Sequence, residues 1–199
     1  MKRLVLAAAL SLATLQASAA VIDFNGLAHD GGLIEVNPLA YGGFLFSNSV
    51  DKQEALGVWG RNEVQQADPG KAAVYVNFAG ATTTMTRAGG GVFDFFAIDL
   101  ADVYNEGTSS TIRFTFTQQG GGTQMENVTL DQLVGLQTFV FNKTALTSVA
   151  WGSADGTGGW NQFDNIVVDP GNPATVPEPA TLALLGLALT GLGFLRRKA

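Results

Sequence analysis

The chain has 199 residues, with 17 acidic against 11 basic side chains, one histidine and no cysteine. This length indicates one domain or at most two, and a content of 46% hydrophobic against 14% charged residues excludes a disordered chain. The lack of cysteine excludes disulfides, thiolate metal sites and cysteine nucleophiles.

The charge is distributed unevenly along the chain. Residues 20–176 hold 16 acidic and six basic side chains, a net charge of −10. Because phosphate backbones and anionic lipid headgroups need clusters of Lys and Arg, this body is predicted to bind neither nucleic acid nor an anionic membrane surface. Divalent cations and neutral glycans remain compatible with it.

Residues 1–19 have the three parts of a secretory signal peptide. Lys2 and Arg3 form a positive start, Leu4 to Leu15 form an apolar stretch, and Ala17-Ser18-Ala19 forms a small–x–small cleavage site. As a helix, the apolar stretch would span only ~18 Å, which is too short for ~30 Å of hydrocarbon. We expect signal peptidase to cut there, so that the mature chain begins at Ala20.

Residues 20–168 are predicted to form one all-β domain. In Thr111 to Thr117 the apolar residues Ile112, Phe114 and Phe116 alternate with polar ones, as in a half-buried strand. Glycine triplets at 89–91 and 120–122 indicate turns, and 131–134 suits at most one helical turn. Strands are expected at 21–25, 44–47, 73–78, 92–100, 111–117, 138–141, 149–151 and 163–168.

Many short strands at even spacing predict an antiparallel β-sandwich. About 150 residues would bury close to 70% of the unfolded surface, enough for a core without disulfides. The early Ile22-Asp23-Phe24-Asn25 and the late Gln162-Phe163-Asp164-Asn165-Ile166 resemble the jelly-roll sandwiches of carbohydrate-binding modules. The fold class predicted is therefore a jelly-roll-like β-sandwich.

That resemblance implies a structural calcium ion where the first and last strands meet, and Asp23 and Asp164 lie in those strands. Calcium takes six to eight oxygen ligands, and the chain lacks a spaced Asp-x-Asp-x-Asp loop. The alternative is that Asp164 caps the entry to its strand and Asp23 is simply solvated.

Two tryptophans are candidates for glycan binding, because sugar rings stack on flat apolar faces. Trp160 follows the glycine-rich run 156–159, and Trp59 is followed by Gly60-Arg61-Asn62, so both lie at loops. An exposed loop tryptophan suggests a use in binding, and the alternative is that the ring folds back onto the core. Trp151 alternates within a strand and is predicted to be buried.

Catalytic residues are not predicted. His29 stands in a polar, glycine-rich loop, and the chain has no Gly-x-Ser-x-Gly elbow that would support a catalytic triad. Pairs of carboxylates could in principle hydrolyse a glycosidic bond, but their abundance here gives no specificity.

The C-terminal segment has its own organisation. A linker at 169–176 leads to Val176-Pro177-Glu178-Pro179, an apolar run from Ala180 to Leu195, and a basic tip of Arg196, Arg197 and Lys198. As a helix the apolar run spans about 24 Å, and the basic side chains can snorkel to extend it. We expect it to insert in the membrane with the tip on the cytoplasmic side.

Together these three elements resemble the tail of PEP-CTERM proteins, which exosortases sort and cut; residues 177–199 would be the sorting signal. The resemblance implies a Gram-negative bacterium that makes extracellular polysaccharide, and removal of the tail at the membrane. It also implies passage through the inner membrane to the cell surface, outer envelope or extracellular matrix.

Three functions remain open at this point. The first is a non-catalytic structural or adhesive surface protein associated with exopolysaccharide. The second is a carbohydrate-binding module, and the third is a glycan hydrolase.

Overall fold

The computed structural model describes residues 19–103, 110–133, 135–156, 158 and 160–169. The all-β prediction is confirmed, because these residues form strands with only two short 3-10 helices, η1 (Asn25–Leu27) and η2 (Gln53–Ala55). The strands are β1 (Ala20–Ile22), β2 (Ile34–Glu35), β3 (Leu39–Tyr41), β4 (Phe44–Asn48), β5 (Leu56–Val58), β6 (Val74–Val76), β7 (Thr82–Arg87), β8 (Phe93–Asp102), β9 (Thr111–Gln118), β10 (Thr123–Thr129), β11 (Gln137–Ser153) and β12 (Asn161–Asp169).

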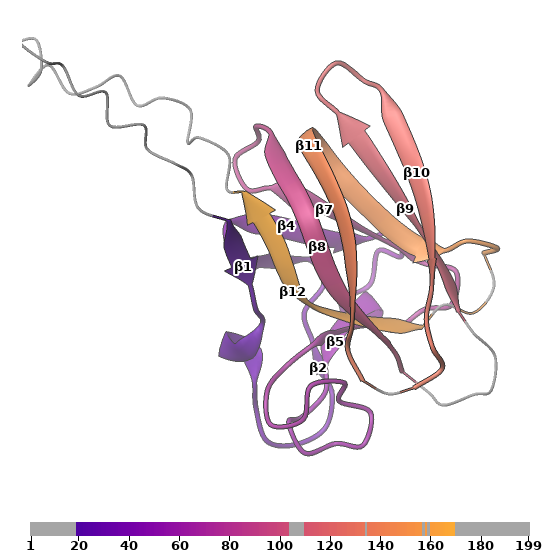
Figure 1. Cartoon of the computed structure of the whole chain (residues 1–199). Coiled ribbons are helices and arrows are strands. Elements are labelled where there is room, and N and C mark those ends of the chain that lie inside the picture. The colour runs from indigo at the N-terminus through magenta and orange to yellow at the C-terminus, as the bar shows by residue number, and fades with distance from the viewer. Residues whose placement is uncertain (1–18, 104–109, 134, 157, 159, 170–199) are drawn as a thin grey trace, which may run out of the picture.

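The strands pair antiparallel in one curled sheet (Figure 1). Its order is β2-β5-β6-β12-β8-β11-β7-β4-β3, with β1 added to β12 and the β9–β10 hairpin added to β11. The first and last strands therefore lie side by side, with Ala20 opposite Val168. Both ends of the domain leave the sheet at this one place.

Strand β11 carries the sheet around the core. Its first half pairs with β8, and its second half lies between β7 and β9. The sequence predicted two separate strands here, at 138–141 and 149–151, and this was wrong. The residues between them do not form a turn: Asn142 and Ala145 adopt left-handed backbone angles (φ 53° and 55°), and the pairing register shifts beside them. Such bulges bend a strand without ending it.

The core lies inside the curl and is rich in aromatic side chains. The ring of Phe163 packs edge-to-face against Phe24 and Trp151, at centroid distances of 5.5 and 5.0 Å. The Phe114 and Phe141 rings approach to 4.5 Å. These residues come from β9, β11, β12 and the segment after β1, so the core joins both ends of the domain; Trp151 is buried as predicted.

Several local predictions can be compared with the described residues. Both glycine triplets form turns with positive φ, at 89–91 between β7 and β8 and at 120–121 between β9 and β10. Residues 131–133 form no helix. Among the described residues no helix is long and apolar enough to cross a membrane. The predicted signal peptide, except Ala19, and the predicted sorting tail lie outside the described residues.

Candidate functional site

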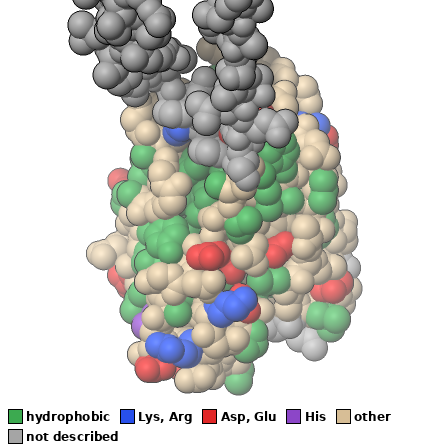
Figure 2. All heavy atoms as spheres, turned by 60° about the vertical axis from the view of Figure 1, so that its left-hand side comes forward, with side chains coloured by type: hydrophobic (Ala, Val, Ile, Leu, Met, Phe, Trp, Pro, Cys, Tyr) green, Lys and Arg blue, Asp and Glu red, His purple; other side chains and the backbone are tan. Residues whose placement is uncertain are grey.

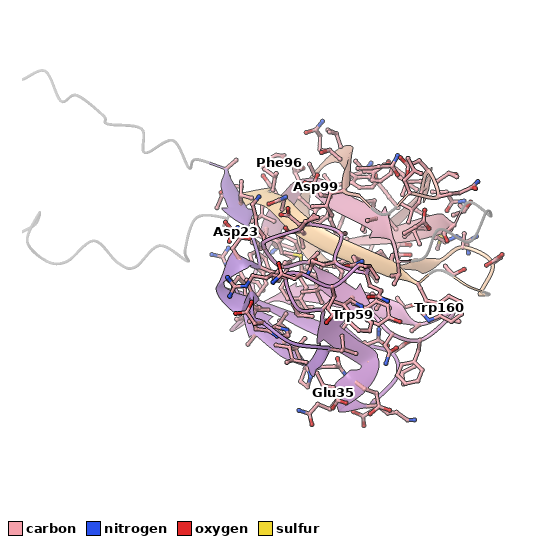
Figure 3. All side chains as sticks on the ribbon, turned by 90° about the horizontal axis from the view of Figure 1, so that it is seen from below. Asp23, Glu35, Trp59, Phe96, Asp99 and Trp160 are labelled. Carbon is pink, nitrogen blue, oxygen red and sulfur yellow. The ribbon has the colours of Figure 1, made fainter. Side chains whose placement is uncertain are left out.

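The start of the domain meets β12 at Asp164, one residue of the predicted calcium pair. The backbone N–H of Phe24 donates to Asp164 Oδ1 at 3.1 Å, which places the neighbouring Asp23 beside the same carboxylate. Asp164 is fully buried, whereas Asp23 is exposed (Figure 3). The other oxygen, Asp164 Oδ2, is buried and accepts no hydrogen bond from the described residues.

Burial sets the electrostatics of Asp164. The pKa of this carboxyl group is raised from 3.8 to about 6, chiefly because burial removes it from water and to a smaller extent because the carboxylates of Asp68 and Asp23 repel its charge. Hydrogen bonds from the backbone N–H groups of Asn165 and Phe24 act in the opposite direction. A proton or a cation bound to Asp164 would neutralise its buried negative charge, which otherwise destabilises the folded domain.

The residues provide part of what calcium needs. Asp164 Oδ2 is buried without a hydrogen bond, and the charge of Asp23 acts on Asp164 as the smallest of the contributions to its pKa. No group of three or more His, Cys, Asp or Glu side chains that could hold a metal ion occurs in the described part of the chain. A calcium ion here would therefore take most of its six to eight oxygens from carbonyl groups and water.

Trp59 lies half-buried at the base of the loop 59–73, not on an open surface. Its ring packs against Tyr75 at a centroid distance of 5.8 Å, and its carbonyl oxygen accepts from Gln66 Nε2 at 2.8 Å. Gln162, buried in β12, holds the same loop by accepting from the N–H of Ala67 at 3.1 Å. Two buried amides thus fix the loop over the outer side of β6 and β12.

Trp160 is also half-buried, directly before β12. Its indole N–H donates to the carbonyl oxygen of Asn77 at 3.0 Å, so the ring is fixed to the segment after β6. Figure 3 shows Trp160 on the side of the molecule away from Asp23. The role of Trp59 and Trp160 in glycan binding stays a prediction, and each ring has a structural contact of its own.

A second cluster, not predicted from the sequence, lies on the outer side of β8. Asp99 Oδ1 accepts from the hydroxyl of Thr138 at 2.6 Å, and Asp99 Oδ2 accepts from the side-chain amide of Asn165 at 2.9 Å. The sequence did contain a signal for Asp99, since this charged residue stands between the buried Ile98 and Leu100 of β8.

His29 has a structural environment. Its Nε2 lies 3.1 Å from the carbonyl oxygen of Val58, and its Nδ1 lies 3.4 Å from that of Asp30. The ring thus joins the loop after η1 to the end of β5.

The four residues Val176 to Pro179 and the basic tip lie outside the described residues, so they are tested by comparison alone. The family model of the PEP-CTERM protein-sorting motif matches residues 175–198. The chain carries a PEP-CTERM sorting motif. This confirms the resemblance predicted for the tail, and the match covers the proline–glutamate segment, the apolar run and the basic tip.

Solved structures resemble the body of this chain at low identity. One is a family 29 carbohydrate-binding module in complex with mannohexaose, with a TM-score of 0.48, 11% identity, and coverage of 77% of this chain and 92% of that one. Another is TmCBM61 in complex with β-1,4-galactotriose, with a TM-score of 0.41, 14% identity, and coverage of 64% and 88%. Those glycans are ligands of those proteins. No curated protein matches this sequence.

Proposed function

We propose that this is an exported bacterial surface protein that an exosortase sorts and cuts, and that its body is a non-catalytic structural or adhesive component of an exopolysaccharide matrix. The observation that carries the proposal is the sorting motif at 175–198. It follows a β-rich body whose first strand begins at Ala20, the first residue after the predicted cleavage site.

The arrangement of the body suits such processing. Strand β12 ends at Asp169, beside the first strand, and the predicted linker and sorting signal follow directly. Pro177 and Pro179 favour an extended backbone around Glu178, which is the form of substrate that a protease binds. We propose that the run from Ala180 to Leu195 then holds the precursor in the inner membrane until it is cut.

We propose that the body is a jelly-roll-like sandwich and that it binds no nucleic acid. Its net charge of −10 between residues 20 and 176 favours a neutral partner. Binding of a glycan is the second candidate function, and the paired carboxylates Asp23 and Asp164 are proposed to hold a structural calcium ion.

The substitution Glu178→Ala tests the sorting proposal. The body should still fold, because the substituted residue lies beyond β12, and the uncut precursor should build up in the membrane fraction. Immunoblots of membrane and medium fractions measure this, with Glu63→Ala, an exposed residue of the body, as the control. Release of the Glu178→Ala protein at the wild-type rate would refute the proposal.

A further inference from the structure

We infer that the outer face of β8, with its neighbours β12 and β11, is a binding site for a neutral oligosaccharide, in which the Phe96 ring stacks on one sugar and Asp99 accepts hydrogen bonds from the next. This inference extends the second candidate function to a site other than the two tryptophans. It does not depend on the sorting of the protein.

The backbone of β8 is built to turn Phe96 away from the core. Opposite β12, Ala97 pairs with Val167 and Phe95 with Val168, so Phe96 is the extra residue of a β-bulge. The register with β11 shifts at the same point. Phe95 and Ile98 belong to the core, whereas Phe96 does not pack against it. Bulges recur beside functional sites because they redirect one side chain.

The surface beside Phe96 is apolar although it faces outward. Val21, Val167, Ala97 and Val140 are directly opposite one another on β1, β12, β8 and β11. Val21 is 58% and Val140 65% exposed. Four neighbouring strands make this row ~14 Å wide. Figure 2 shows hydrophobic side chains beside acidic ones on the side of the molecule that carries β1.

A polar row lies next to the apolar one. Asp99 and Thr138 are directly opposite one another on β8 and β11, and the buried Asp164 lies opposite Asp99 on β12. The donors from Thr138 and Asn165 hold both carboxylate oxygens of Asp99 in place, and each oxygen keeps a lone pair for a further donor. Asn165 adopts a left-handed backbone (φ 45°), which aims its side chain at Asp99. The acceptor is thus preorganised, and binding costs little side-chain entropy.

These two rows match the chemistry of a sugar chain. Sugars present apolar C–H faces to aromatic rings and hydroxyl donors to carboxylates. Phe96 and Asp99 are three residues apart, or ~10 Å along a strand, so one sugar ring cannot fill both positions. The site therefore fits an oligosaccharide. The acidic body and the carboxylate at the centre disfavour an anionic polymer.

The side chain at position 96 gives the decisive test. The full-length chain in detergent is tested by affinity electrophoresis against three neutral polymers, β-1,4-glucan, β-1,4-mannan and β-1,4-galactan, and by calorimetry with the hexaose of the polymer that binds. Phe96→Trp should keep the affinity, whereas Phe96→Leu, which stays apolar but lacks a flat face, should lower it about tenfold. Asp99→Asn, which keeps one acceptor oxygen, should also weaken binding.

Controls separate this site from general effects. Met125→Ala removes another exposed apolar side chain, on β10, and should change nothing. Melting curves must show that each variant folds as the wild type does. The monosaccharide should bind far more weakly than the hexaose.

Other results would overturn the inference. The first is that the wild type binds none of the three polymers. The second is that Phe96→Leu binds as tightly as the wild type. The third is that affinity falls only when Trp59 or Trp160 is replaced. Light scattering that shows a dimer, dispersed by Phe96→Leu, would assign the face to a second copy of the chain. None of these results bears on the sorting proposal, because Glu178→Ala is read from membrane and medium fractions.

Discussion

Replacing Asp164 by Asn should stabilise the folded domain at neutral pH and leave its stability unchanged in acid. Asparagine has the shape of the protonated carboxyl group, and its oxygen can still accept from the N–H of Phe24. The substitution therefore removes the buried charge and keeps the hydrogen bond that Asp164 Oδ1 accepts at 3.1 Å.

The sign follows from the proton balance. Burial raises the pKa of Asp164 from 3.8 to about 6, so between these values the folded chain keeps a proton that the unfolded chain has lost. The stabilisation from this proton is complete below about pH 3.8 and is lost as the pH rises through about 6. At 1.36 kcal/mol per pH unit, the full effect is about 3 kcal/mol.

Thermal unfolding of residues 20–169 in excess EGTA measures this effect. For a domain of this size, 1 kcal/mol corresponds to about 2–4 °C, so Asp164→Asn should melt about 6–12 °C above the wild type at neutral pH. The two curves should converge at about pH 4. Asp51→Asn, at an exposed position, is the control and should shift little. An Asp164→Asn protein no more stable than the wild type at neutral pH would refute the reasoning.

Three further outcomes are expected. If Asp23 and Asp164 bind calcium, saturation at ~100 Kd adds about 2.7 kcal/mol to the free energy of unfolding. Excess EGTA should then lower the melting temperature by several degrees, and Asp164→Ala should abolish that response. A melting curve that EGTA leaves unchanged would end the calcium proposal. Gly60→Ala should destabilise the domain by about 3 kcal/mol, because a Cβ there would lie 1.7 Å from the carbonyl oxygen of Gly31. The control Gly32→Ala, whose Cβ would have nothing within 4 Å, should cost little stability in a denaturant titration. Equal losses of stability in the two variants would show that the contact between Gly60 and Gly31 is wrong. Edman sequencing of exported protein should begin at Ala20, and a start at Met1 would reject the predicted signal peptide.

The sequence predicts strands best where one face enters the core and the other faces solvent. Strand β9 shows this, since the alternation of Ile112, Phe114 and Phe116 with polar residues predicts only a half-buried strand. Strand β7 was missed because its sequence is mostly threonine. In this strand both Thr83 and Met85 are fully buried, so the pattern of polar and apolar residues does not show which side chains are buried.

Bulges limited the prediction most. Asn142 and Lys143 have the composition of a turn, and only the pairing of β11 with three other strands shows that the chain continues. Likewise, residues 92–100 were correctly predicted as a strand. The alternation of polar and apolar residues in this strand, however, cannot reveal that Phe96 faces outward. That follows from register shifts on two neighbouring strands.

The candidate sites were predicted unevenly for similar reasons. The antiparallel pairing of the first and last strands lets the N–H of Phe24 donate to Asp164, whereas calcium binding by Asp23 and Asp164 stays a prediction. The tryptophans were placed correctly at loops, but the acceptor that Asn77 offers to Trp160 is 83 residues away in the chain. Contacts at that separation depend on the fold as a whole.

The intact mass of the protein released from its native host tests the central claim most directly. The sorting proposal predicts a chain that begins at Ala20 and has lost Ala180 to Ala199, with or without an added group at the new C-terminus. The membrane fraction should hold a precursor that still ends at Ala199. A released protein that retains the whole segment through Ala199 would contradict the account.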